Sequence, residues 1–233
     1  MKWGNKLKRI HFETLPSTQD FAKEKRTEGL PFIVTATAQS GGKGTKGRSF
    51  SSTVGGVYLS KLSFYEDFPA KRAFLIMAST AVAVCETLRF YGIQPLIKWP
   101  NDVWVGDKKI CGILIENVFS GDKISSSVVG IGLNVHNVLP EDLHSIATTM
   151  LKVTGEAYDV DDVTNRLIAE LDKPRGMDEY RAYVGYMGRQ ATLILGDECV
   201  HGTLLFVDDE GGLMVKINGE TRRFTAAEVS VRI

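Results

Sequence analysis

Two lysines, an asparagine and an aspartate lie close together in one short stretch of this chain. The run Lys98-Trp99-Pro100-Asn101-Asp102 is followed by Lys109-Ile110-Cys111-Gly112. The ring of Pro100 excludes the helical region for the residue before it, and Asn and Asp side chains favour a turn by bonding nearby backbone. A hairpin with solvated surface charges would be the structural alternative. The convergence of these groups on a corner made rigid by proline favours a functional site instead.

A second candidate stretch, residues 39–50, reads Gln-Ser-Gly-Gly-Lys-Gly-Thr-Lys-Gly-Arg-Ser-Phe. Its glycines and cations are typical of a loop whose amides and side chains wrap an anion. Residues 42–49 nearly match the phosphate loop G-x-x-x-x-G-K-[ST], but Arg48 replaces the lysine and turn residues follow where that motif requires a helix. The sequence therefore argues against a P-loop and leaves an anion-binding loop or a disordered surface loop.

The elements around the first stretch explain how its groups meet. Residues 94–98 and 103–105 have the composition of short strands, Gly106-Asp107 predicts a hairpin turn, and residues 109–118 predict a buried return strand. This hairpin brings together four polar side chains beside the small Gly112, namely Lys98, Asn101, Asp102 and Lys109.

Other elements are expected on both sides of the hairpin. Ser17 and Asp20 have the spacing of a capping box, so Ser17 begins a helix and can present Thr18 and Gln19 to a ligand. Strands are expected at residues 8–13, 32–38, 57–64 and 123–135, and helices at 70–91 and 159–171. Glycines inside residues 128–135 indicate close approach of a ligand or another backbone. Asn134 in that strand is either a satisfied core amide or a nucleotide ligand.

From residue 190 the pattern changes to five short alternating segments separated by turns, which predicts a small antiparallel barrel. The expected fold is therefore α+β, with a mixed sheet flanked by helices in residues 1–187 and a barrel in residues 188–233.

Composition narrows the function classes. Lys plus Arg and Asp plus Glu both total 28, so a net charge of zero argues against a general nucleic-acid binder. The three cysteines are widely spaced and the four histidines scattered, which favours a reducing cytoplasm and no dedicated metal site. No signal peptide and no apolar run of about 18 residues is evident, so we expect no membrane contact.

With these motifs in view, the chain resembles the biotin protein ligases, also called biotin–[acetyl-CoA-carboxylase] ligases, over nearly its whole length. The marks are Ser17-Thr18-Gln19, the loop at residues 39–48, Lys98-Trp99-Pro100-Asn101-Asp102, residues 109–112, residues 130–134 and the ending Glu228-Val229-Ser230-Val231-Arg232. The resemblance implies a class II synthetase-like catalytic domain followed by an SH3-like barrel. Because fewer than ten residues precede Lys8, it implies the monofunctional kind, without a helix-turn-helix domain and without DNA binding.

The resemblance implies that biotin attacks Mg-ATP to give biotinyl-5′-AMP, which a lysine of a biotin carboxyl carrier protein then takes up. Cations would cancel charge repulsion as the carboxylate meets the phosphates, and acyl transfer would depend on positioning. The implied catalytic residues are Lys109, Arg48 and Lys98. The implied biotin-binding residues are Ser17, Thr18, Gln19, Gln39, Gly42, Lys43, Gly44, Thr45, Lys109, Gly112 and Gly132. The implied nucleotide-binding residues are Lys43, Arg48, Phe50, Asn101 and Asn134, and Asp102 is expected to orient either the target lysine or the Mg²⁺.

The chain departs from the family pattern in its loop, where Lys43, Thr45 and Lys46 stand at positions that usually include several arginines. We hypothesise that neutral Thr45 holds the adenylate less tightly than a charge-assisted donor would. Phe50 replaces a frequent tryptophan, and the segment around Pro174 is shorter than usual, which suggests a truncated joining helix. A lipoate or octanoate ligase and a non-catalytic biotin- or carrier-binding module remain the competing interpretations. An edge strand at residues 8–13 would allow a homodimer.

Overall fold

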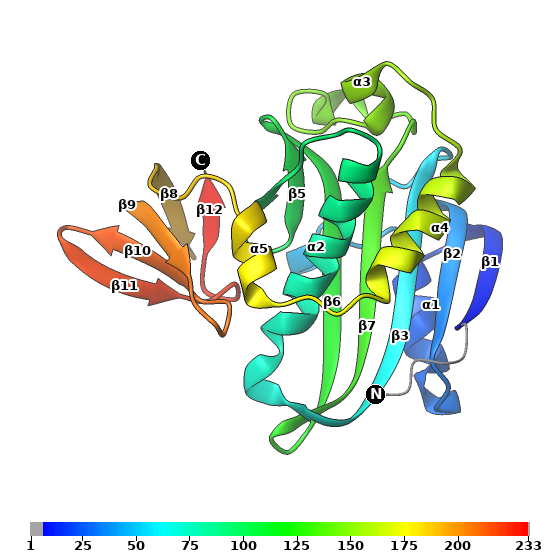
Figure 1. Ribbon diagram of the computed structural model, residues 1–233, viewed down its shortest axis with the longest axis horizontal. Helices are drawn as coiled ribbons and strands as arrows, with labels where there is room; N and C mark the ends of the chain where they lie inside the picture. Colours follow the sequence, from blue (N-terminus) through cyan, green and yellow to red (C-terminus); the bar gives the residue numbers. More distant parts are fainter. Residues whose placement is uncertain (1–6, 233) are drawn as a thin grey trace.

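The computed structural model describes residues 7–232, which form two β-sheets with helices packed on the larger one (Figure 1). The seven-stranded sheet has the order β1-β2-β3-β7-β6-β5-β4. β1 runs parallel to β2, and every other neighbouring pair is antiparallel, so the sheet is mixed as expected. Its strands are β1 (Lys8–Leu15), β2 (Phe32–Gln39), β3 (Gly56–Pro69), β4 (Leu96–Lys98), β5 (Asp102–Val105), β6 (Lys108–Ser120) and β7 (Lys123–Asn134).

Alternation along β2 separates the two faces of this sheet. Phe32 and Val34 pack in one buried cluster with Ala22 of helix α1 (Thr18–Glu24), whereas Ile33 between them belongs to the larger cluster on the other face. Helices α2 (Phe74–Phe90), α4 (Val160–Leu171) and α5 (Met177–Tyr183) cover that other face (Figure 1). One face of the sheet is therefore covered by α1 over β2, β3 and β7, and the other face by three helices.

Helix α2 is apolar nearly all round because it lies in the middle of the core. Val82, Cys85 and Leu88 are fully buried, and short 3₁₀ turns at Ala70–Arg72 lead into the helix. Among the residues described, the stretch Ala70–Phe90 has the length and composition of a membrane-crossing helix. The expectation that no apolar run of this length exists was therefore wrong, because burial against the sheet on one side and α4 and α5 on the other makes polar residues unnecessary there.

The smaller helices follow local signals. Ser17 caps α1 by accepting from Asp20 N (3.3 Å), and Asp159 caps α4 by accepting from Asp162 N (2.9 Å). Thr149 caps the short helix α3 (Met150–Thr154) in the same way. Further 3₁₀ turns lie at Lys25–Glu28, Thr45–Gly47 and Glu141–Leu143. The starts of α1 and α4 agree with the sequence predictions.

The C-terminal strands form a separate five-stranded antiparallel sheet with the order β11-β10-β9-β8-β12. They are β8 (Gln190–Leu195), β9 (Glu198–Val207), β10 (Leu213–Ile217), β11 (Glu220–Phe224) and β12 (Ser230–Arg232). The second antiparallel unit is confirmed and is consistent with an SH3-like domain, and β11 and β12 lie at the two ends of its strand order. Gly188, with a φ of 80°, lies just before β8, at the domain boundary predicted from the sequence.

Two hydrogen bonds hold the Lys98–Asp102 corner, one to the C-terminal sheet and one to helix α5. The indole Nε1 of Trp99 donates to Gly211 O (3.0 Å) in a buried position. The hydroxyl of Tyr180, fully buried on α5, donates to Pro100 O (2.8 Å). The corner is therefore held from both the helical layer and the C-terminal sheet.

Candidate functional site

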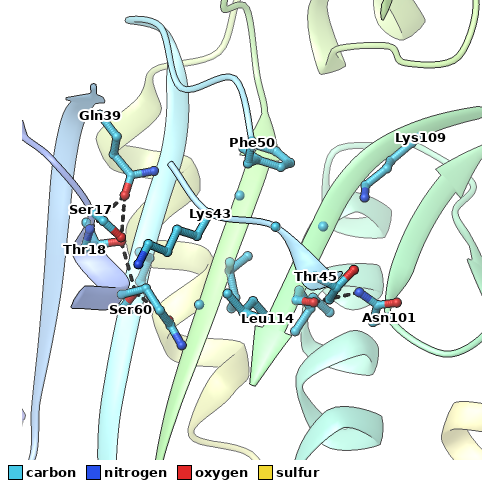
Figure 2. A pocket seen from close by; sticks show the side chains of 18 residues that line it. Ser17, Thr18, Gln39, Lys43, Thr45, Phe50, Ser60, Asn101, Lys109 and Leu114 are labelled. Carbon is cyan, nitrogen blue, oxygen red and sulfur yellow. Dashed lines mark hydrogen bonds between the residues drawn. The ribbon is translucent and has the colours of Figure 1, made fainter. Parts of the chain in front are cut away.

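A pocket that is open to solvent lies on the strands at the centre of the large sheet. Twelve of the residues predicted from sequence line it: Ser17, Thr18, Gln19, Gln39, Lys43, Gly44, Thr45, Phe50, Asn101, Lys109, Gly112 and Gly132. They come from α1, the loop after β2, the β4–β5 corner and the strands β6 and β7, far apart in sequence (Figure 2). The structure therefore brings residues of every motif except the C-terminal ending into one site.

The floor of the pocket is made by two rows of paired residues across β3, β7 and β6. One row is Ser60–Gly130–Leu114, and the other is Tyr58–Gly132–Gly112. A Cβ at Gly130 would lie 2.5 Å from Gln19 Oε1, and one at Gly132 would overlap the Phe50 ring. Side chains from other elements therefore occupy the space that these two residues leave, which is why a strand this deeply buried carries glycine.

One end of the pocket is lined by hydroxyl and amide groups. Thr18 donates from its backbone N and from Oγ1 to Gln39 Oε1, at 2.8 and 3.1 Å, and Ser60 Oγ donates to Thr18 Oγ1 (3.0 Å). Figure 2 shows these side chains and Ser17 grouped on one side of the pocket. All of them are buried or half-buried, so a ligand group placed here meets fixed polar partners.

The middle of the pocket is apolar. Leu114, the strand glycines and the Phe50 ring over the glycine row provide this surface. Leu59, Ile113 and Ile131 adjoin the pocket at alternate strand positions, and their side chains belong to the core cluster on the other face of the sheet. Phe50 also packs edge-on against Tyr58, with ring centroids 6.5 Å apart. This section suits an aliphatic chain or a ring without polar atoms.

The opposite end carries a cation. Lys109 Nζ lies 2.6 Å from Asp102 Oδ1, above Gly112, where a Cβ would lie 3.1 Å from the amine. Asn101 Nδ2 donates to Ile113 O (2.8 Å). The backbone of Lys109 is clamped, because its N–H donates to Ile146 O (2.9 Å) and its carbonyl accepts from Thr148 N (2.8 Å). Figure 2 shows Lys109, Asn101 and Thr45 on the side away from Thr18.

The glycine-rich loop is ordered by a short bridge between Lys43 and Ser49. Lys43 Nζ lies 2.7 Å from an Asp20 carboxylate oxygen. Partial burial alone would raise the pKa of Asp20, but hydrogen bonds from Lys43 and Lys23 outweigh it and lower that pKa. The carboxylate therefore keeps Lys43 at the polar end, away from Lys109.

Besides Asp102, which forms an ion pair with Lys109, four residues predicted for the site do not line the pocket. Arg48 is exposed and folds back on Thr45, with Nε 3.3 Å from Thr45 O and Nη2 3.1 Å from Thr45 Oγ1. Gly42 is a buried residue of the loop and lies next to Phe50 O and Ser52 Oγ. Lys98 and Asn134 are the other two.

Lys98 and Asn134 have other partners. Lys98 Nζ lies 4.2 Å from the centroid of the Trp104 ring, and burial lowers the pKa of Lys98, while Asp102 opposes this shift. Asn134 is buried, donates to Thr148 O (3.1 Å) and accepts from Asn137 Nδ2 (3.2 Å). In this structure the Asn134 amide is satisfied within the core, where its hydrogen bonds hold the loop after β7, and its nucleotide-binding role stays a prediction.

Sequence reasoning did not assign several lining residues to the site, chiefly Ser60, Leu114 and Gly130, with Leu59, Ile113 and Ile131. Ser60 and Leu114 carry no local signal, because each is an ordinary strand residue. Gly130 carried a local signal, since a glycine inside an apolar strand indicates the close approach of a ligand or another backbone.

The arrangement can hold an elongated ligand with a polar head at the Thr18 end, an apolar body over the glycines and an anionic group at Lys109. Within the described residues, no group of three or more His, Cys, Asp or Glu side chains is arranged to hold a metal ion. Cys111, close to Lys109 in sequence, is fully buried, and burial raises the pKa of its thiol, so it does not offer a thiolate nucleophile.

Comparison with known proteins places these features in one family. The model of the biotin/lipoate A/B protein ligase family matches residues 11–134, slightly more than half of the chain. The bifunctional ligase/repressor BirA of Bacillus subtilis is 31% identical over 242 residues, covering 95% of this chain and 73% of the relative. The biotin–[acetyl-CoA-carboxylase] ligase of Mycobacterium tuberculosis is 28% identical over 212 residues, covering 84% of this chain and 77% of the relative.

Among solved structures, the biotin protein ligase of Aquifex aeolicus in complex with biotin and ATP superposes with a TM-score of 0.79 at 26% identity. The match covers 97% of this chain and 98% of that one. The agreement extends through the C-terminal sheet as well as the catalytic sheet. This chain therefore belongs to the biotin/lipoate A/B protein ligase family.

Proposed function

We propose that this protein is a biotin ligase that uses ATP to attach biotin to a lysine of a biotin carboxyl carrier protein, through biotinyl-5′-AMP. The observation that carries the proposal is the three-part pocket, because biotin has a polar ureido head, an apolar ring and chain, and a terminal carboxylate. The Thr18–Gln39 end suits the ureido group, and Lys109 suits the carboxylate. Relatives named biotin–[acetyl-CoA-carboxylase] ligase support a carboxylase carrier as the protein substrate.

In the first step, a biotin carboxylate oxygen bonds to the α-phosphorus of ATP, and pyrophosphate leaves as the α–β phosphate bond breaks. Two anions must approach each other, so Lys109 lowers the repulsion at the carboxylate. Its clamped backbone and its ion pair with Asp102 hold the amine at that end before substrate arrives. Mg²⁺ would be supplied with ATP and would offset the charge of the phosphates.

In the second step, the carrier lysine amine attacks the carbonyl carbon of the adenylate and AMP leaves. This step depends mainly on positioning, so no serine or cysteine nucleophile is needed. Asp102, beside Lys109, is placed to orient the incoming amine or the metal. To bind phosphate, the Arg48 side chain must first break its hydrogen bonds with Thr45. Lys98, whose amine lies over the Trp104 ring, contributes a further positive charge.

The remaining expectations belong to the same proposal. Residues 1–187 act as the catalytic domain and residues 188–233 as the C-terminal domain. β1 forms one edge of the large sheet in the described chain, and two copies could pair there as a homodimer.

Biotin-dependent exchange of labelled pyrophosphate into ATP tests the function, with lipoate and octanoate run in parallel. Exchange with biotin alone is expected. Exchange with lipoate or octanoate instead would move the chain to the other branch of the family, and no exchange with any acid would favour a non-catalytic binding module. Transfer to a purified carrier domain then tests the second step.

A further inference from the structure

We propose that Ser52 is a positioning residue that fixes the Gln39 amide at the polar end of the pocket and ties it to the backbone of Phe50. This role rests on the proposed biotin ligase function. Ser52 is 5% exposed and lies in the turn between the glycine-rich loop and β3, outside the pocket lining. No motif in the sequence singled it out.

The hydrogen bonds around Ser52 run in one direction. Gln39 Nε2 donates to Ser52 Oγ (2.8 Å), and Ser52 Oγ donates to Phe50 O (3.0 Å). Since a hydroxyl has a single proton, Ser52 gives that proton to Phe50 and accepts from Gln39. The NH₂ group of the Gln39 side chain, and not its carbonyl oxygen, must therefore face Ser52.

The other side of Gln39 agrees with this orientation. Gln39 Oε1 accepts from Thr18 N (2.8 Å) and from Thr18 Oγ1 (3.1 Å), and Ser60 Oγ donates to Thr18 Oγ1 in turn. With Oε1 held by two donors and one amide hydrogen held by Ser52, the second amide hydrogen of Gln39 remains to donate into the pocket. A ureido carbonyl is an acceptor of the kind that this hydrogen suits.

Gly42 shows how tightly the connection is packed. A Cβ at Gly42 would lie 2.5 Å from Ser52 Oγ and 3.1 Å from Gln39 Nε2, and it would overlap Phe50 O. The three groups thus converge at the one place where the loop has no side chain. The main chain closes the same unit, because Gln39 N donates to Ser52 O (3.0 Å) and Phe50 N donates to Gly42 O (2.8 Å).

Phe50 carries the connection to the other half of the pocket. Its backbone carbonyl is held by Ser52, while its ring lies on the glycine row, within 3.2 Å of where a Gly112 Cβ would be. Ser52 therefore joins the residue that recognises the polar head to the ring that covers the path to Lys109.

The test is a double-mutant cycle on the purified full chain, with biotin affinity measured by calorimetry and Michaelis constants measured by pyrophosphate exchange. Ser52→Ala should weaken biotin binding about tenfold, because the Gln39 amide loses its acceptor and is free to rotate. It should raise KM for biotin similarly and leave KM for ATP within about twofold. In a Gln39→Ala background, adding Ser52→Ala should change biotin affinity less than about twofold.

Ser51→Ala is the matched control, because Ser51 is the neighbouring serine and is half-buried. In the described structure it makes no side-chain hydrogen bond to Gln39. It should leave both constants within about twofold of the parent. A tenfold loss of biotin affinity from Ser52→Ala in the Gln39→Ala background as well, or an equal rise of KM for ATP, would overturn the role of Ser52. A parent chain without biotin-dependent exchange would overturn the proposed function and, with it, this role.

Discussion

Lys109 and Asp102 form an ion pair, 2.6 Å between Nζ and Oδ1, at the end of the pocket opposite the hydroxyl and amide groups. The two residues come from neighbouring strands, β6 and β5, and Asp102 is paired in register with Gly112. The glycine leaves room for the lysine stem to lie across the strand. The register between β5 and β6 therefore determines where the Lys109 amine and the Asp102 carboxylate lie.

The ion pair leads to a prediction for Lys109→Gln. Removing the positive charge should lower the rate of biotin-dependent pyrophosphate exchange by about 100-fold, because one preorganised charge donor at the developing adenylate is lost. Lys108→Gln is the control, since Lys108 donates to His144 O (2.9 Å) on the neighbouring loop and does not line the pocket. Equal losses in the two variants would contradict a specific role for Lys109.

Two tryptophans allow the contact between the catalytic corner and the C-terminal sheet to be isolated. Trp99→Phe removes the donor to Gly211 O and should lower the free energy of unfolding by about 1–3 kcal/mol beyond the loss of ring volume. Trp104→Phe is the matched control, because Trp104 Nε1 is buried without a hydrogen-bond partner in the described structure. Urea denaturation of both variants measures the difference, and no difference would mean that the Trp99 bond contributes nothing.

The glycine-rich loop offers a prediction about retention of the intermediate. Thr45 lines the pocket, and its neutral hydroxyl accepts from Arg48. Thr45→Arg should slow dissociation of biotinyl-5′-AMP about tenfold, because a charged donor binds a phosphate more strongly than a hydroxyl does. Stopped-flow release of the adenylate measures this rate, with Ser49→Arg as a control for added loop charge. Unchanged release in Thr45→Arg would reject the idea that Thr45 makes the loop leak.

Glu170 on α4 supports a prediction about pH. Its carboxylate is 1% exposed and contacts Arg166 (2.6 Å), Lys173 (2.8 Å) and Arg175 (2.7 Å). Burial would raise the pKa of Glu170, but these cations outweigh it and lower that pKa. Glu170→Gln should lower the free energy of unfolding at pH 7 by about 2–3 kcal/mol, since it leaves partly buried cations without their carboxylate.

The sign of the pH effect follows from the lowered pKa. The contribution of Glu170 is complete above the pKa of the unfolded chain, about 4.3, and is lost as pH falls through the lower folded pKa. The gap between Glu170→Gln and the parent should therefore narrow between pH 5 and pH 2, as measured by urea denaturation. A gap that stays constant over this range would show that the carboxylate charge is not its source.

Much of this site was determined by the sequence itself, because the signals are local. Ser17 sets the start of α1 by capping it, and Pro100, Asn101 and Asp102 set the corner between two strands. Glycine and cation content marked the loop at residues 39–50. The helix cap, the corner and the loop each depend on backbone preferences and hydrogen bonds within a few residues. They can therefore be predicted from the sequence without knowledge of the fold.

The remaining features were decided by tertiary structure. Ser60 and Leu114 face the pocket only because both pair with Gly130 across β7, and a shift of one residue would turn them to the other face. The hydrogen-bond partners of Asn134, and the contacts that hold Arg48 against Thr45 outside the pocket lining, depended on tertiary contacts or on loop packing. Strand register and long-range contacts fix which side of a sheet a residue meets, and the local sequence does not encode them.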